Sequence, residues 1–264
     1  MAELKTIKNF ILDMDGVLYR GKQLLPGAKE FLTFLQEENV PFLLLTNNAT
    51  MTPARRVERL ASLGIQVKES NILTSSQAAA LYLRKVARPG ATVYVIGEEG
   101  LCQPLLEHGF RVVEDKAADF VVVGMDRKLT YEKLKRATLS IRAGARFIAT
   151  NPDRTFPSEE GLVPGAGAIV AALEASTDVK PEVIGKPETA IFEMALEKMG
   201  VGKEGTAVVG DRLETDILGA GRAGLKSILL LCGVSSKKDL EKAEIGPDFV
   251  FEDLAHLLKE WAAA

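Results

Sequence analysis

The sequence is poor in cysteine and has no long apolar run. Its 264 residues contain two cysteines, Cys102 and Cys232, which lie far apart and lack the spacing of a metal site. A disulfide-stabilised scaffold is therefore excluded. No apolar stretch approaches the roughly 18 residues that a membrane span needs, and residues 1–8 contain no apolar signal region. We expect a protein of the reducing cytoplasm with no membrane partner.

An excess of basic residues is also absent. The 33 lysines and arginines are mixed along the chain with 36 acidic residues, and the formal net charge is -3. Nucleic-acid binding depends on a basic stripe that neutralises phosphates, so no nucleic-acid partner is expected. Internal repeats and low-complexity segments are missing as well. With 47% hydrophobic residues, the chain can bury the core of one large domain or two smaller ones.

Apolar strands alternate with amphipathic helices along nearly the whole chain. This alternation predicts an α/β fold built on a doubly wound, Rossmann-like parallel sheet. The pattern is interrupted at Arg88-Pro89-Gly90 and again at the polar stretch 177–181. Because the segment between these points has its own strands and helices, we expect an inserted α/β domain over 88–179, with 1–87 and 180–264 together forming the core domain.

Two further segments have a predicted local structure. Residues 150–165 are expected to form a long irregular loop, and such loops are more often functional than idle. Within this loop Arg154 and Phe156 either reach over the substrate or belong to a polar hinge, and the sequence does not decide between these roles. Arg55-Arg56 is expected to be a solvated helix face.

Two carboxylates follow the first predicted strand. The apolar residues 10–12 end in Asp13-Met14-Asp15, with Gly16 next. Side chains alternate along an extended backbone, so Asp13 and Asp15 should lie on the same side. Gly16 permits a sharp turn that keeps both acids at the carboxyl end of the strand, where open α/β sheets bind their ligands.

Polar side chains follow three more predicted strands of the core domain. Thr46, Asn47 and Asn48 offer a hydroxyl, two amides and backbone N–H groups that can bind oxygen atoms. The short strand 183–184 leads into Lys186, whose point charge suits a phosphate. The strand 207–209 leads into a segment with Asp211 and Asp216. A cluster of carboxylate oxygens at one sheet edge favours a hard cation, and Mg²⁺ is the expected cofactor.

Each of these motifs alone is more often structural. An Asp-x-Asp pair after a strand is usually a turn with a cap, Thr-Asn-Asn is typical of an Asx turn, and Gly-Lys-Pro is typical of a surface turn. Acidic residues after a strand are also favoured at a helix N-terminus. Here all four motifs follow strands of one alternating pattern, so their convergence at one sheet edge favours a catalytic interpretation.

These motifs, in this order, resemble those of the haloacid dehalogenase superfamily. The segments that carry the resemblance are DMDGVL at Asp13 to Leu18, LLTNN at Leu44 to Asn48, IGKP at Ile184 to Pro187 and VGDRLETD at Val209 to Asp216. The short gap between the first two motifs, the long insert before the lysine and the stretch ATNPD are similar to the NagD and 4-nitrophenylphosphatase branch. The resemblance covers nearly the whole chain.

The resemblance implies a role for each matching residue. Asp13 would be the nucleophile, and Asp15 the general acid and base. Thr46 and Lys186 would bind the phosphate, with Asn47 and Asn48 beside them. Asp13, Asp211 and the backbone carbonyl of Asp15 would bind Mg²⁺, and the insert would be a mobile cap.

The expected function is Mg²⁺-dependent hydrolysis of a small phosphorylated metabolite through an aspartyl-phosphate. Family members act on sugar phosphates, nucleotide monophosphates, phosphoglycolate, pyridoxal phosphate or 4-nitrophenyl phosphate, and no residue here selects among them. Asp216 is expected either to bind the metal through water or to hold Lys186 or Asp211 in place. A phosphomutase and a receiver-type phospho-acceptor module are the alternatives. The resemblance also implies that two chains can pair through their caps.

Overall fold

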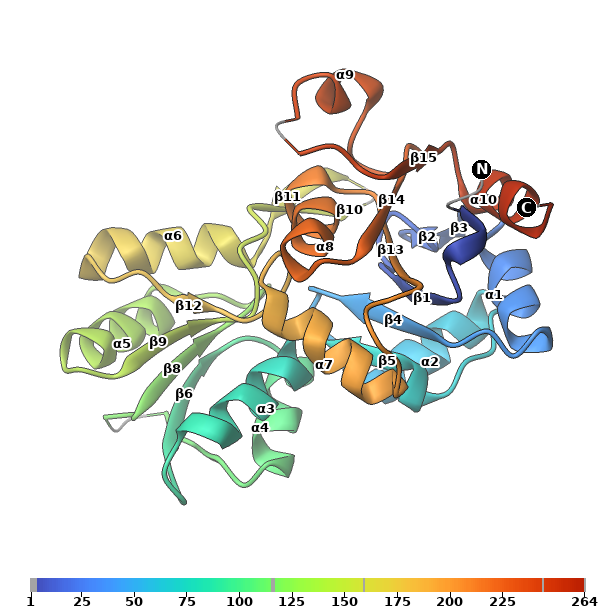
Figure 1. Cartoon of the computed structure of the whole chain (residues 1–264). Coiled ribbons are helices and arrows are strands. Elements are labelled where there is room, and N and C mark those ends of the chain that lie inside the picture. Colours follow the sequence, from blue (N-terminus) through green and yellow to red (C-terminus); the bar gives the residue numbers. More distant parts are fainter. Residues whose placement is uncertain (1–3, 115–116, 159, 244, 264) are drawn as a thin grey trace. The chain divides into compact units, whose positions relative to one another are not determined.

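The computed structural model describes residues 4–114, 117–158, 160–243 and 245–263. Packing divides the chain into two compact units (Figure 1), which we describe one at a time. The first unit comprises residues up to Thr46, Val57–Leu73 and the residues from Lys186 onward; the second comprises Asn47–Arg56 and Thr74–Gly185. The domain limits 1–87, 88–179 and 180–264 stay a prediction, and the packing groups residues 47–56 and 74–87 with the second unit.

The first unit contains a six-stranded sheet with the order β15-β14-β13-β1-β4-β5. Strand β1 pairs in parallel with β13 on one side and with β4 on the other. The chain therefore builds the sheet outward from β1 in one direction and later from β13 in the other, which creates a topological switch point between these two strands. The bounds are Asn9–Leu12 (β1), Phe42–Thr46 (β4), Ile72–Thr74 (β5), Thr206–Gly210 (β13), Lys226–Leu230 (β14) and Phe249–Phe251 (β15).

Helices cover both faces of this sheet. On one face α1 (Ala28–Glu37) and α10 (Leu254–Ala262) pack together over a core that includes Phe10, Leu12 and Leu44. The alternate residues of the strands, such as Ile11 and Leu43, are equally buried and face the opposite side, where α7 (Thr189–Met199) and α8 (Leu218–Ala223) lie. The remaining elements of this unit are α9 (Lys237–Leu240), the short hairpin β2 (Tyr19–Arg20) and β3 (Gln23–Leu24), and the single turns η1 (Leu4–Thr6), η2 (Glu69–Asn71) and η3 (Leu213–Ile217).

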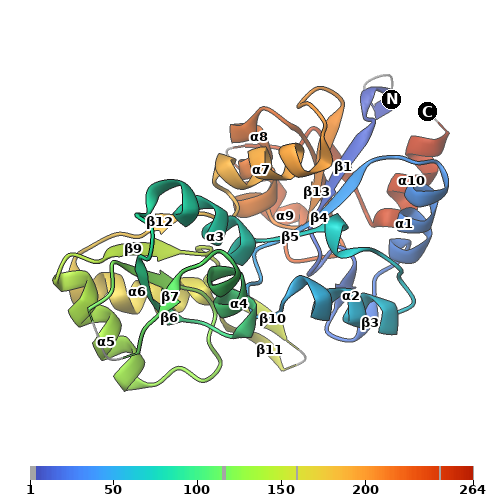
Figure 2. The same ribbon diagram turned by 90° about the horizontal axis from the view of Figure 1, so that it is seen from below.

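The second unit has its own sheet of five strands, in the order β12-β9-β8-β6-β7. All of its pairs are parallel. Helices α5 and α6 pack together over a core that includes Ile96, Val121 and Ile141, while α3 and α4 form a second pair (Figure 2). The bounds are Thr92–Ile96 (β6), Arg111–Val112 (β7), Phe120–Val123 (β8), Arg146–Ala149 (β9), Glu182–Val183 (β12), Ser75–Val86 (α3), Glu99–Glu107 (α4), Tyr131–Arg142 (α5) and Ala166–Thr177 (α6).

Local sequence signals set several helix ends. The side chain of Thr130 caps α5 by accepting a hydrogen bond from the Lys133 backbone N–H at 3.2 Å. Gly200 follows α7 with φ +69°, in the left-handed conformation that glycine adopts readily. Within the described ranges, no helix is both long enough and apolar enough to span a membrane. The expected α/β architecture with parallel sheets is confirmed.

Three expectations about local structure are wrong. The short strand before Lys186 belongs to the second sheet, where β12 pairs with β9, and not to the sheet of the core domain. Segment 150–165 is not irregular, because it contains the antiparallel hairpin of β10 (Thr155–Ser158) and β11 (Gly161–Pro164). Its sequence lacks a clear period-2 alternation, so pattern alone did not reveal the strands.

The third error concerns helix α2 (Pro53–Ser62). Arg55 is exposed as expected, but the Arg56 side chain is fully buried. Arg56 lies one helical turn before the buried Leu60 and therefore shares its face. Arginine side chains are usually exposed to solvent, but the position of Arg56 on the helix places its side chain in the interior.

Candidate active site

Two acidic residues lie on either side of the switch point of the first sheet. Asp13 directly follows β1, and Asp211 directly follows the neighbouring parallel strand β13. Asp13 is 8% exposed and Asp211 is fully buried. The neighbouring Met14 packs into the apolar core, so its side chain lies away from the acids, as strand alternation predicts. Ligands of open α/β sheets bind at such a position.

Lys186 connects the nucleophile candidate to a third acid. Its Nζ lies 2.5 Å from Asp13 Oδ1 and 2.6 Å from Asp216 Oδ1, and it also donates to the backbone carbonyl of Leu45 at 3.3 Å. The lysine is 2% exposed. A buried ammonium held by these oxygens has a fixed position, so Lys186 holds the Asp13 carboxylate in one orientation. In the described part of the chain, no hydrogen bond to the second oxygen of Asp13, Oδ2, accompanies this contact.

Asp216 reaches this position through a π-helical turn. Turn η3 follows Arg212, and the Ile217 N–H donates to the Arg212 carbonyl at 3.2 Å, five residues back. The second carboxylate oxygen of Asp216 accepts the Arg212 backbone N–H, also at 3.2 Å. Both oxygens of Asp216 are thus engaged by the protein, which favours the expected role of holding Lys186.

The Asp211 carboxylate occupies a tight backbone cradle. Its Oδ2 accepts the backbone N–H of Val234 at 2.8 Å. Glycines border it on two sides, since a Cβ atom at Gly16 would lie 2.2 Å from Asp211 Oδ2 and one at Gly233 would lie 2.1 Å away. Its other oxygen, Oδ1, is buried and has no hydrogen-bond partner among the described residues. A buried, unpartnered carboxylate oxygen requires a cation or a proton.

Burial and mutual repulsion shift the titration of these groups. Burial raises the pKa of Asp13 well above its usual range, against the opposing effect of the Lys186 ammonium. Burial, together with the nearby Asp216, raises the pKa of Asp211 to about 7. Burial alone would lower the pKa of Lys186, but the Asp13 and Asp216 carboxylates outweigh it and raise that pKa above its ordinary value. Lys186 is therefore a cation at neutral pH, and its single positive charge faces three gathered carboxyl groups, those of Asp13, Asp211 and Asp216.

This arrangement fits a divalent metal ion. Asp13, Asp211 and Asp216 each offer a carboxylate oxygen, and these oxygens lie within 4.8 Å of one another. Hard oxygen ligands are those that Mg²⁺ and similar cations prefer. Both carboxylate oxygens of Asp216 are engaged by Lys186 and the Arg212 N–H, so Asp13 and Asp211 are the better candidates for direct ligands.

Asp15 and Thr46 form a second pair in the same unit. Thr46 ends β4, next to β1, and its Oγ1 donates to Asp15 Oδ2 at 3.5 Å. Thr46 is buried, whereas Asp15 is half-buried and more open than Asp13. Gly16, with φ +94°, makes the turn that the sequence predicted after these acids.

Asn47 and Asn48 belong to the second unit. The amide nitrogen of Asn47 donates to the two carboxylate oxygens of Asp153 at 3.3 and 3.1 Å. The side-chain oxygen of Asn48 accepts from the backbone N–H and the hydroxyl of Thr50 at 3.1 and 2.7 Å. These side chains fix the turn after Thr46, and their expected contact with phosphate stays a prediction.

The cap residues that the sequence singled out lie at the hairpin. Arg154 is exposed, and its carbonyl accepts the Gly165 N–H at 2.9 Å. Phe156 is a half-buried residue of β10. Whether either residue reaches a substrate stays a prediction.

Sequence reasoning missed the glycine that makes room for Asp211. Gly233 follows β14, so a glycine just after a strand was the available signal. We expect Gly233→Ala to displace the Asp211 carboxylate and to weaken metal activation about 10- to 100-fold, as loss of a supporting contact does in metal sites. Titration of activity with Mg²⁺ measures the effect. Gly202→Ala is the matched control, because its Cβ would meet nothing within 4 Å and its φ is not positive; equal activation constants for the two variants would refute the cradle.

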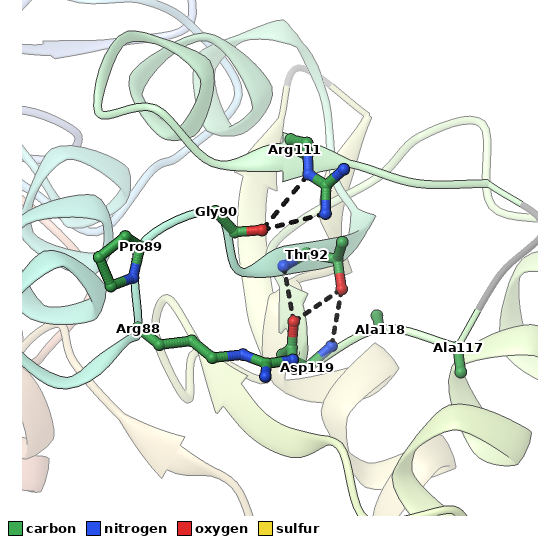
Figure 3. Close-up of a pocket in the computed structure, with 8 residues that line it drawn as sticks. All are labelled: Arg88, Pro89, Gly90, Thr92, Arg111, Ala117, Ala118 and Asp119. Atoms are coloured by element: carbon green, nitrogen blue, oxygen red, sulfur yellow. Dashed lines mark hydrogen bonds and ion pairs between the residues drawn. The ribbon is translucent and has the colours of Figure 1, made fainter.

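The second unit contains a pocket of about 550 Å³ with a different character (Figure 3). It lies at the amino ends of parallel strands, where Thr92 begins β6 and Arg111 begins β7. Its polar groups already pair with one another: Asp119 accepts from Arg88 and Thr92, and Arg111 donates to the Gly90 carbonyl. This location is opposite to the ligand-binding end of such sheets, so the pocket is not the candidate active site.

Family profiles and relatives of known name match this chain. The profile of haloacid dehalogenase-like hydrolases matches residues 10–111, and a HAD-hydrolase-like profile matches residues 183–257. An acid sugar phosphatase of Staphylococcus epidermidis is 41% identical over 251 residues, which are 95% of this chain and 96% of the relative. The chain belongs to the haloacid dehalogenase (HAD) family. It is an enzyme, a phosphatase of the NagD-like branch.

Solved structures of related proteins match nearly the whole chain. The 4-nitrophenylphosphatase of Thermotoga maritima is 43% identical with a TM-score of 0.91, over 97% of this chain and 98% of that one. NagD of Escherichia coli K-12 is 40% identical with a TM-score of 0.87, over 95% and 98% of the two chains. A glycerol phosphate phosphatase of Mycobacterium tuberculosis, solved in complex with magnesium, is 36% identical with a TM-score of 0.90, over 96% of this chain and 77% of that one.

Proposed function

We propose that this HAD phosphatase hydrolyses monoesters of small phosphorylated metabolites, sugar phosphates foremost, through a phosphoryl group carried on Asp13. The observation that carries the proposal is the pairing of Lys186 with Asp13 Oδ1 at 2.5 Å beside Asp211 and Asp216. One oxygen of the nucleophile is held by this contact, and the other remains for attack.

In the first step Asp13 Oδ2 attacks phosphorus. A bond forms between this oxygen and phosphorus while the ester P–O bond breaks. The leaving alkoxide takes a proton from the carboxyl group of Asp15, so that the alcohol departs neutral. Asp15 is suited to this role because it is more open than Asp13 and its carboxylate accepts a hydrogen bond from the Thr46 hydroxyl.

In the second step water attacks the phosphoryl group on Asp13. Asp15, now a carboxylate, accepts the proton of the water, and the bond between phosphorus and the Asp13 oxygen breaks. Inorganic phosphate leaves, Asp13 is again a carboxylate, and Asp15 again holds a proton. The enzyme is unchanged after the two displacements.

Charge on the transferring oxygens is stabilised by groups that are already fixed. Lys186 and the Thr46 hydroxyl would bind these oxygens, and preorganised donors of this kind supply much of the acceleration in phosphoryl transfer. Asp13, Asp211 and the Asp15 carbonyl would hold Mg²⁺, which supplies further charge neutralisation at the phosphoryl group. Asp216 keeps Lys186 in place from the far side.

A screen for phosphate release over many monoesters tests the proposal. We expect Mg²⁺-dependent release of free phosphate in equal amount to the dephosphorylated alcohol, with sugar phosphates giving the highest kcat/KM. Transfer to a second hydroxyl without free phosphate would indicate a phosphomutase instead. Stoichiometric labelling without turnover would indicate a phospho-acceptor module. A tenfold preference for nucleotide monophosphates or glycerol phosphate would overturn the sugar phosphate assignment alone.

Metal binding can be tested without measuring activity. A saturating excess of Mg²⁺ of about 100 times its Kd should stabilise the native protein by about 2.7 kcal/mol, which differential scanning calorimetry detects as a higher Tm. Asp211→Asn should abolish this increase, because it removes the carboxylate whose Oδ1 lacks a protein partner. An undiminished increase in the variant would place the metal elsewhere.

Two further expectations accompany this function. Pairing of two chains through the second unit stays a prediction, which light scattering of the purified protein tests directly. The cytoplasmic location also stays a prediction.

A further inference from the structure

Arg56 is a buried arginine whose side chain donates to one acceptor among the described residues. Its side chain is fully buried in the first turn of α2, and its Nη2 donates to the backbone carbonyl of Asn48. The Nε and Nη1 groups have no hydrogen-bond partner in the described part of the chain. Burying a guanidinium with so few acceptors costs stability. Stability therefore does not account for this arginine.

The carbonyl that Arg56 binds belongs to the turn after Thr46. Other contacts already hold the first part of this turn: the Asn47 carbonyl accepts from Ser75 Oγ at 2.8 Å and from Asn151 Nδ2 at 2.7 Å. The Arg56 side chain donates to the next carbonyl, that of Asn48. Because a peptide group is planar, fixing this carbonyl also fixes the following N–H, which points the opposite way. Arg56 thus determines the path of the backbone just beyond the predicted phosphate ligands.

We propose that Arg56 is a positioning residue for phosphate binding. Its side chain orders the turn of Asn47 and Asn48 by binding the Asn48 carbonyl, and its burial lowers the stability of the protein. This inference rests on the proposed function, in which Thr46 and the two asparagines bind the phosphate. It predicts opposite changes in two properties when the charge is removed. Phosphate binding weakens because the turn loses its tether, while stability stays the same or rises because an incompletely solvated charge leaves the interior.

The neighbouring arginine provides a matched control. Arg55 lies on the same helix, but its side chain is 60% exposed and pairs with Glu99 at 3.1 Å. Methionine at either position keeps an unbranched side chain of similar length without charge or N–H donors. Lysine at position 56 keeps the positive charge and can still donate to the Asn48 carbonyl, although without the planar geometry of arginine.

The test compares Arg56→Met, Arg56→Lys and Arg55→Met with the wild-type protein. We expect Arg56→Met to lower kcat/KM for 4-nitrophenyl phosphate about 10- to 100-fold and to raise the Ki of inorganic phosphate at least fivefold, with a Tm equal to or above that of the wild type. Arg56→Lys should recover part of both kinetic losses. Arg55→Met should remain within twofold of the wild type in kcat/KM and in the phosphate Ki, with an unchanged Tm.

A structural role would give the reverse pattern. If Arg56→Met lowered the Tm while kcat/KM and the phosphate Ki per folded molecule stayed normal, the proposal would be overturned. If Arg56→Met did not fold, the cost in stability would be refuted, and a normal phosphate Ki in Arg56→Lys would refute the positioning role. Asp13→Asn, assayed in parallel, distinguishes failure of the proposed function from failure of the positioning role of Arg56. Activity retained in Asp13→Asn contradicts the proposed function, whatever the arginine variants show.

Discussion

Replacing Asp13 with asparagine is expected to lower kcat on the order of 10⁴-fold or more, with the protein still folded. The amide cannot attack phosphorus, so no covalent intermediate forms, and removal of a nucleophile costs rate on this scale. The introduced amide would keep an oxygen that can accept from Lys186, and Lys186 would keep its 2.6 Å contact with Asp216. Steady-state phosphate release and circular dichroism together measure activity and folding.

Asp178→Asn is the matched control for this substitution. The Asp178 side chain is 91% exposed and has one long ion pair of 3.8 Å, and its positive φ of 61° suits asparagine as well. Its activity should equal that of the wild type. Near-normal turnover in Asp13→Asn would remove Asp13 from the role of nucleophile.

Replacing Lys186 with methionine is expected to impair both activity and stability. Asp13 and Asp216 would lose their shared cation inside the protein, and breaking a buried ion pair from one side costs about 3–5 kcal/mol. Loss of a fixed positive group at the transferring phosphoryl should lower kcat by about 10²- to 10³-fold. Urea denaturation and phosphate release measure the two effects.

Added Mg²⁺ should restore part of the stability of Lys186→Met, because a divalent cation can offset the repulsion between the remaining carboxylates. It should not restore the turnover, since the ammonium that held Asp13 Oδ1 is gone. Lys237→Met, at a lysine with a 70% exposed side chain that pairs with Glu252, serves as the control and should change neither property. A stable Lys186→Met protein with normal kcat would contradict the assigned network.

The strands that carry the acids could be predicted from the sequence because they are short, continuous and apolar. The expected strands 10–12 and 207–209 correspond to β1 and β13, and the polar residues after them meet because parallel strands end at the same edge. Asp216 was expected either to bind the metal through water or to hold Lys186 or Asp211; its carboxylate contacts Lys186 at 2.6 Å, and the role toward the metal stays a prediction. The spacing of these residues along the sequence could not show which partner Asp216 contacts.

Features that depend on tertiary packing could not be predicted in the same way. The strand before Lys186 is two residues long, and nothing in Glu182–Val183 specifies that its partner is β9 rather than a strand of the first sheet. Arginine side chains are rarely buried, so residue type gave the wrong expectation for Arg56. The available sequence signal was its four-residue spacing from Leu60, which places both side chains on the same face of the helix. The space that Gly233 leaves for Asp211 exists only when the loop after β14 has packed against that carboxylate.

Chemical trapping of the covalent intermediate tests the central claim most directly. Protein mixed with a turned-over substrate and Mg²⁺ is quenched in acid and reduced with borohydride, which converts an aspartyl-phosphate to homoserine, and peptides are then analysed by mass spectrometry. The proposed mechanism predicts homoserine at position 13 and at no other aspartate, in the wild type and not in Asp13→Asn. Steady release of phosphate with Asp13 unmodified, or with homoserine at Asp15 or Asp211, would contradict it.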